Sequence, residues 1–109
     1  MKKGFSKKEK QLRTEKDHDA TLLKSTMALP GIWTVGAARL AETWRMTTIG
    51  HMVGQYRAHL QMSTSRAAAV ESFAQMIASH AGLQLHRVRG TARYIDWLVE
   101  TIRRREEED

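Results

Sequence analysis

Residues 63–105 read STSRAAAVESFAQMIASHAGLQLHRVRGTARYIDWLVETIRRR and carry the clearest helical signals in the chain. Ser63, Thr64 and Ser65 are residue types that favour the N-cap of a helix. An apolar stripe with i, i+3, i+4 and i+7 spacing follows, which is typical of one buried helix face. The stripe consists of Val70, Phe73, Ala74, Ile77 and Ala81. Gly82 comes where a glycine ends many helices in a left-handed turn, so a helix that stops there is predicted.

A basic connector and a second amphipathic helix follow Gly82. The connector, residues 83–90, is expected to form a short helical turn with its aliphatic side chains inward. Gly90 should then break or kink the chain, and Thr91 should cap the final helix, because glycine disfavours helix interiors. The stripe predicted to be buried on this final helix consists of Tyr94, Ile95, Leu98 and Ile102. The acidic residues 106–109 are expected to fray.

Residues 1–26 predict a polar helix with a frayed start. Ser6 is the candidate N-cap, and Glu9 three residues later completes the capping-box pattern. Apolar positions are sparse, so the first half of this segment is expected to be mobile in isolation. The only proline of the chain, Pro30, is followed by Gly31. Because proline restricts the residue before it and cannot continue a helical ladder, this helix should stop by Ala28.

Two apolar stripes cover residues 32–61. The first consists of Trp33, Ala37, Leu40 and Trp44, and the second of Ile49, Val53, Tyr56 and Leu60. The five-residue step between them shifts the phase, so two helices or one kinked helix are predicted, with a short strand as the alternative at the break near 46–50. Trp33 and Trp44 are interpreted as core anchors, or else as an exposed pair that binds a partner. Gly50 and Gly54 would let another helix approach closely.

These elements predict an all-α protein, a small bundle of four to five helices with a mobile basic N-terminal arm. A chain of 109 residues suits one domain rather than two. The expected boundaries are 1–28 for the basic polar N-terminal helix or arm, 29–105 for the helical core domain and 106–109 for the acidic tail.

The chain carries 18 Lys and Arg against 12 Asp and Glu, a formal charge of +6. Such an excess favours nucleic acid, anionic membrane surfaces or acidic proteins as partners. No run of about eighteen apolar residues occurs, so no membrane insertion is expected. Polar residues follow the basic start where a signal peptide would be apolar, and a cytoplasmic location is therefore expected. The lack of cysteine excludes disulfides and thiolate metal sites.

No pattern typical of an enzyme is present in the sequence. The five histidines include no HExxH pair, and His51 and His59 lie two helical turns apart, too far to share one ion. Residues 17–19, Asp-His-Asp, have the side chains of metal ligands, but neighbouring residues diverge on a helix. We therefore expect no catalytic residues, no cofactor and no metal.

The chain around Gly82 fits a DNA-binding helix-turn-helix in part. In that motif a helix ends near a glycine, a short turn follows, and the second helix enters the major groove. Gly82 matches the turn glycine, whereas Gly90 and Thr91 interrupt the helix that would contact DNA. The alternative is a basic connector in a helical bundle, with its arginines solvated or paired to Asp96 and Glu100.

The function expected first is nucleic-acid binding by a non-catalytic accessory or regulatory protein. A lysine arm and an arginine-rich connector would contact phosphates. The candidate residues are Lys2, Lys3, Lys7, Lys8, Lys10, Gln84, His86, Arg87, Arg89 and Arg93. The alternative is an adaptor, assembly subunit or inhibitor that docks on an acidic protein surface. Its candidate interface residues are Trp33, Trp44, Gly50 and Gly54, and a homodimer would cover such apolar residues.

Overall fold

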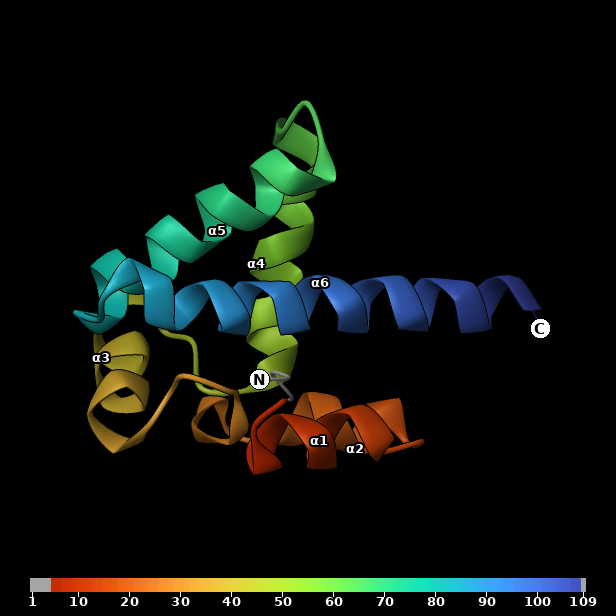
Figure 1. Cartoon of the computed structure of the whole chain (residues 1–109), viewed down its shortest axis with the longest axis horizontal. Coiled ribbons are helices and arrows are strands. Elements are labelled where there is room, and N and C mark those ends of the chain that lie inside the picture. Colours follow the sequence, from red (N-terminus) through yellow and green to blue (C-terminus); the bar gives the residue numbers. More distant parts are fainter. Residues whose placement is uncertain (1–4, 109) are drawn as a thin grey trace, which may run out of the picture.

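The structure is a computed structural model that describes residues 5–108 of the chain. Six α-helices and one short 3-10 helix make up its regular structure (Figure 1). They are α1 (Lys7–Thr14), α2 (His18–Leu23), η1 (Thr26–Ala28), α3 (Thr34–Trp44), α4 (Ile49–Met62), α5 (Arg66–Ala81) and α6 (Leu85–Glu108). The described residues contain no strand, only an isolated bridge between Ser25 and Thr48. The predicted all-α bundle is confirmed.

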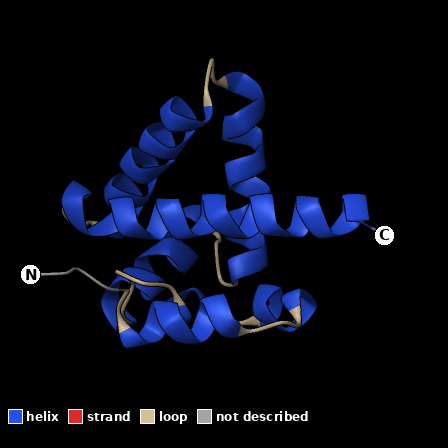
Figure 2. Ribbon diagram, turned by 45° about the vertical axis from the view of Figure 1, so that its right-hand side comes forward, coloured by secondary structure: helices blue, strands red, loops and turns tan. Residues whose placement is uncertain are grey.

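Helix α6 crosses the molecule, and the other helices are arranged around it. In Figures 1 and 2, α4 passes behind α6, α5 lies with the second half of α4 on one side of α6, and α1 and α2 lie together on the other. The most extensive contacts between two helices are those of α5 with α6. The largest side chains of the core are Tyr56, Tyr94, Phe73, Leu29, Ile32 and Leu40, all fully buried.

Local capping explains where several helices begin and end. The Ser65 hydroxyl accepts a hydrogen bond from a first-turn N–H and caps α5, as predicted. Gly82 ends α5 with a φ of +66°, the left-handed conformation expected of it. The predicted break before α4 is also confirmed, because Arg45 turns the chain with a φ of +57° and Thr48 caps the new helix.

The break predicted at Gly90 and the N-cap predicted at Thr91 are wrong. Helix α6 begins at Leu85 and continues through both residues. Thr91 is fully buried, and its hydroxyl donates to the carbonyl oxygen of Pro30 instead of capping a helix. A glycine weakens a helix by only about 1 kcal/mol, and the burial of several large side chains on α6 outweighs that cost.

Replacing Gly90 with alanine is expected to stabilise the protein by about 0.5–1 kcal/mol, because glycine is the weaker helix former in a helix interior. A Cβ at this position would have only a guanidinium nitrogen of Arg93 near it, at 4.0 Å, which is an ordinary contact. Chemical denaturation of the two proteins measures the difference. A marked loss of stability in the variant would contradict a continuous α6.

The N-terminal segment forms two short helices, α1 and α2, in place of the single helix predicted over residues 1–26. Ser6 caps α1 as predicted, with its hydroxyl oxygen 3.2 Å from the Glu9 amide nitrogen. The Glu9 side chain does not complete a capping box; it is buried and pairs with Arg13 at 2.7 Å. Leu12 belongs to the core cluster, so α1 packs on the core, and mobility of the arm stays a prediction.

The expected acidic tail is part of α6 as far as Glu108, and the prediction that it frays is wrong for the described residues. Arg103 pairs with Glu100 on one side and with Glu107 on the other, about one turn away in each direction. Such pairs between successive turns favour helix, so the last turns stay regular. Asp109 lies outside the described residues.

Candidate nucleic-acid interface

A hollow of about 480 Å³ lies between the start of α1 and the first half of α6. The turn at Pro30 and Gly31 forms a third wall. The lining residues are Phe5, Ser6, Glu9, Arg13, Pro30, Gly31, Gly90 and Arg93. The basic N-terminal segment and the basic connector lie far apart in the sequence, and this hollow is where the fold brings them together.

The turn at Pro30 and Gly31 is held against α6 at close range. The Thr91 hydroxyl donates to the Pro30 carbonyl oxygen. Gly31 has a φ of +84°, and a Cβ on it would lie 2.8 Å from both the Arg87 carbonyl oxygen and the Thr91 hydroxyl oxygen. Only glycine fits such a position. This wall of the hollow is therefore fixed relative to α6.

Two arginines of the candidate set, Arg87 and Arg93, are exposed. Neither pairs with an acidic side chain within residues 5–108. Arg93 lines the hollow, and Arg87 belongs to the turn of α6 that contacts Gly31. The Arg93 guanidinium can therefore meet an anionic partner in the hollow, and the exposed Arg87 guanidinium is also available to such a partner.

Arg89 is held in an ion pair at the surface, between α6 and α5. Its guanidinium donates to both carboxylate oxygens of Glu71 on α5, at 3.0 and 2.9 Å. The hydrogen bond is the largest cause of a lowered pKa at Glu71 and a raised pKa at Arg89. Because the Glu71 pKa is depressed on folding, the stabilisation is present above the ordinary carboxyl pKa and is lost as the pH falls. Arg89 is thus less available to a partner than Arg87.

The other candidates for phosphate contacts lie at the ends of the same two helices. Gln84, before α6, and His86, in its first turn, are exposed, as are Lys7 and Lys10 on α1. Lys8 is half-buried, and burial lowers its pKa. Lys2 and Lys3 lie outside the described residues.

Two exposed aromatic rings flank α1, each beneath a cation. The ammonium of Lys8 lies 3.5 Å from the ring centroid of Trp33 and also donates to the Ile32 carbonyl oxygen. The guanidinium carbon of Arg13 lies 4.0 Å from the ring centroid of Phe5. Neither Phe5 nor Arg13 was predicted as a site residue. Phe5 precedes α1 and its N-cap Ser6, so helical spacing gave no signal that Phe5 and Arg13 would meet.

The residues proposed for a partner interface have different environments. Trp33 is 57% exposed, so its interpretation as a core anchor is wrong. Trp44 is half-buried and stacks on a histidine of α5, with ring centroids 4.6 Å apart. Gly50 allows a close approach, as predicted, since a Cβ on it would lie 3.0 Å from the Leu22 carbonyl oxygen of α2. A Cβ on Gly54 would meet nothing within 4 Å.

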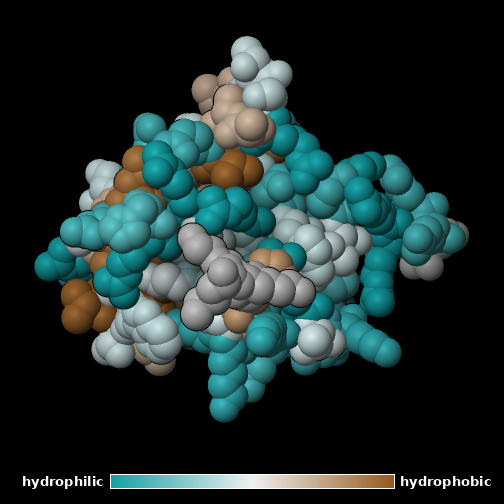
Figure 3. Space-filling model, in the orientation of Figure 1, coloured by the Kyte–Doolittle hydropathy of each residue, from teal (hydrophilic) through white to brown (hydrophobic). Residues whose placement is uncertain are grey.

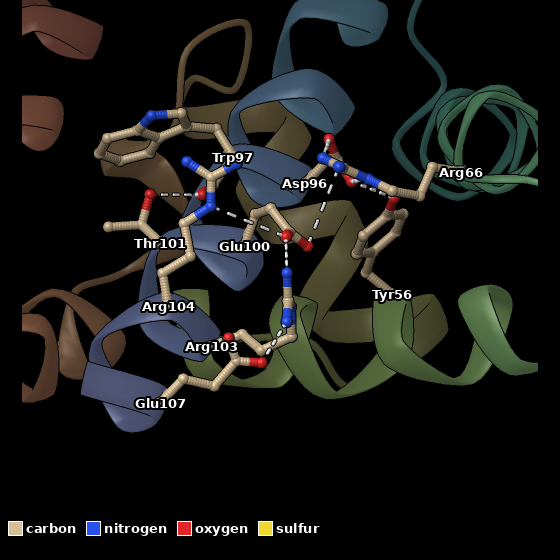
Figure 4. A network of polar contacts seen from close by, with 9 residues as sticks. All are labelled: Tyr56, Arg66, Asp96, Trp97, Glu100, Thr101, Arg103, Arg104 and Glu107. Carbon is tan, nitrogen blue, oxygen red and sulfur yellow. Dashed lines mark hydrogen bonds and ion pairs between the residues drawn. The ribbon is translucent and has the colours of Figure 1, made fainter. Parts of the chain in front are cut away.

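A polar cluster joins α4, α5 and α6 away from the hollow (Figure 4). The Tyr56 hydroxyl donates to Asp96 at 2.6 Å, and the Arg66 guanidinium donates to both oxygens of the same carboxylate, at 3.2 and 2.6 Å. Tyr56 is fully buried, and burial is the main cause of its raised pKa, followed by the bond to Asp96. Each of these groups has a partner, so the cluster acts as a cross-link between helices.

The surface differs between the two ends of the face seen in Figure 3. Hydrophilic side chains cover the end where the C-terminal half of α6 lies, and hydrophobic ones gather over α5 and α3. None of the described helices is both long enough and apolar enough to cross a bilayer.

Comparison with protein-family models, with curated proteins and with solved structures finds no match to this chain. Its function is therefore inferred from the geometry and chemistry of its own residues.

Proposed function

We propose that the protein binds nucleic acid through phosphate contacts, as a cytoplasmic accessory or regulatory protein without catalysis. The observation that carries the proposal is the hollow between α1 and α6, which is lined by one arginine from each helix, Arg13 and Arg93. Arg93 lines it, Arg87 lies beside its Gly31 wall, and exposed Lys7 follows Ser6 in the chain. Guanidinium groups recognise phosphate oxygens with two parallel hydrogen bonds.

Two further features of the hollow suit a phosphate backbone. Gly31 and Gly90 both line it, so the main chain there carries no side chains that would keep a ligand away. The formal charge of +6 also attracts a polyanion from a distance. Glu9 is the acidic residue in the lining, and its charge is neutralised by Arg13 at 2.7 Å.

Replacing Arg87 and Arg93 together with alanine is expected to weaken binding to nucleic acid about tenfold or more at low salt, because two phosphate-binding groups are removed. The slope of log affinity against log salt should also become shallower by about 0.7–0.9 for each phosphate that is no longer neutralised. Fluorescence anisotropy of a labelled oligonucleotide across a salt series measures both quantities.

The matched control is Arg57→Ala. Arg57 is also exposed, but it lies on α4 beside the C-terminal end of α6, among Val99 and Arg103. It removes one positive charge away from the hollow, against two in the double variant, so its effect should be small even for each charge removed. Equal losses of affinity in both variants would show that binding depends on the net charge of the protein and not on the hollow. Absence of any binding at low salt would exclude the proposed function.

An adaptor that docks on an acidic protein surface is the second candidate function. It is favoured by three exposed apolar side chains close together in the sequence, Met27, Trp33 and Val35. Met27 and the start of α3 are in contact, since the Thr34 hydroxyl lies 3.6 Å from the Met27 sulfur. Exposed aromatic and methionine side chains are enriched in interface cores. This candidate predicts that an acidic polypeptide binds at least as tightly as an oligonucleotide.

A further inference from the structure

The aromatic side chains of the protein fall into two groups. Tyr56, Phe73 and Tyr94 are fully buried, and Trp44 and Trp97 are half-buried beside the core. Phe5 and Trp33 are the other two, and they are 52% and 57% exposed. A single exposed apolar residue is ordinary on a protein surface. Two exposed rings that each lie beneath a cation, beside the same basic helix, are a more specific arrangement.

Each exposed ring has its cation on one face and open surface elsewhere. The Lys8 ammonium lies 3.5 Å from the Trp33 centroid, and the Arg13 guanidinium carbon lies 4.0 Å from the Phe5 centroid. More than half of each side chain still faces solvent, so one part of each ring is free to stack. At Trp33 a flat ring with an ammonium against it matches a nucleotide, which offers a flat base and an anionic phosphate close together. At Phe5 the Arg13 guanidinium is already paired with Glu9, and Arg93 is the cation of the hollow that is left for a phosphate.

The two rings lie beside the same helix, α1, with Phe5 in the hollow and Trp33 outside it. Phe5 lines the hollow opposite Gly90 and Arg93. Gly31 lines the same hollow, and Trp33 follows it by two residues, in contact with Lys8 of α1. A strand of nucleic acid in the hollow would meet Phe5 and the exposed Arg93, and a strand that continues past Lys8 of α1 would reach Trp33 as a second ring. This alternation of stacking and charged groups is how proteins bind single strands without sequence preference.

The structure is less suited to a duplex. In a duplex the bases stack on one another, so exposed rings find no base to stack on. The first half of α6 would have to enter the major groove, yet its Val88 is fully buried and Arg89 is held by Glu71 at 2.9 Å. Among the described residues, Arg87 and Arg93 are the arginines of that half of α6 without an ion pair, and we expect them to contact phosphates and not the edges of bases.

We infer that the ligand is single-stranded nucleic acid, whose bases stack on Phe5 and Trp33 while Arg87 and Arg93 bind its phosphates. The inference rests on the function proposed above and names the class of nucleic acid for that surface. It places the specificity for unpaired bases on the two exposed rings and the affinity for phosphate on the arginines of α6.

The test compares a labelled oligothymidylate of about fifteen nucleotides with a duplex of the same length, by fluorescence anisotropy at low salt. The single strand is expected to bind at least tenfold more tightly. Trp33→Leu should weaken single-strand binding about tenfold, whereas Trp33→Phe, which keeps a ring, should stay within about threefold. Val35→Ala is the matched control, because Val35 is 64% exposed and aliphatic, and its binding should not change. Phe5→Leu and Phe5→Tyr are a second pair of variants, without and with an aromatic ring. They test stacking at a residue that is not part of the start of α3.

The outcomes separate the inference from the proposed function. Equal affinity for single strand and duplex, or a Trp33→Leu variant that binds as well as Val35→Ala, overturns the inference and leaves phosphate binding intact. Absence of binding to either nucleic acid at low salt overturns the proposed function as well. Polyglutamate that binds as tightly as the oligothymidylate overturns both and favours an acidic protein partner. Circular dichroism of each variant shows whether the helical fold is retained.

Discussion

Replacing Gly31 with alanine is expected to destabilise the protein by about 3 kcal/mol, a large part of the stability of a typical domain. Two effects contribute. At a φ of +84° an alanine is strained by about 1–2 kcal/mol. Its Cβ would also lie 2.8 Å from the Arg87 carbonyl oxygen and from the Thr91 hydroxyl oxygen, so α6 and the turn must separate, at about 1–3 kcal/mol.

Thermal and urea denaturation followed by circular dichroism measure this effect, and for a domain of this size the Tm should fall by more than about 10 °C. Gly54→Ala is the matched control. Gly54 lies inside α4, and a Cβ on it meets nothing within 4 Å, so alanine should be neutral or slightly stabilising there. A Gly31→Ala variant as stable as the parent would show that the turn is not held against α6.

Replacing Asp96 with alanine is expected to destabilise the protein by about 2–4 kcal/mol. The Asp96 carboxylate accepts the hydroxyl of Tyr56 at 2.6 Å, and Tyr56 is fully buried. Removal of the carboxylate leaves that hydroxyl without a partner where water does not reach, which costs about 1–3 kcal/mol. The ion pair with Arg66 is removed as well, but the Arg66 side chain is 53% exposed, so this part should be less than about 1 kcal/mol.

A double-mutant cycle with Tyr56→Phe tests the cause. If the unpaired hydroxyl dominates, Asp96→Ala should cost much less in the Tyr56→Phe background than in the parent. Arg66→Met serves as the control for the ion pair and should lower the free energy of unfolding by less than about 1 kcal/mol. Additive effects of Asp96→Ala and Tyr56→Phe would contradict the proposed cross-link between α4 and α6.

Some features of the candidate site were predictable from the sequence, and others were not. Gln84, His86, Arg87 and Arg93 are exposed as expected of an outward-facing basic connector. The pairing of Arg89 with Glu71 was not predicted, because it joins two helices whose relative rotation no local pattern specifies. For Trp33 burial was expected first and exposure only as the alternative; the side chain is exposed because Trp33 precedes the first residue of α3.

What the sequence by itself determined is the position of most helix ends. Ser65, Gly82 and Thr48 act through hydrogen bonds or backbone conformations that involve residues only a few positions away, so their effects are visible in the local sequence. The all-α class follows from the same local patterns, through the 3.6-residue period of the buried stripes.

Tertiary structure alone decided the continuity of α6 and the hollow beside it. A local preference against Gly90 amounts to about 1 kcal/mol, and the burial of the neighbouring Val88 and Ala92 side chains against other helices exceeds it. The meeting of α1 with α6 involves Arg13 and Trp97, whose guanidinium carbon and ring centroid lie 4.7 Å apart and which no local periodicity connects. Interactions between distant segments are set by packing of the whole chain, and for that reason they emerge only from the folded structure.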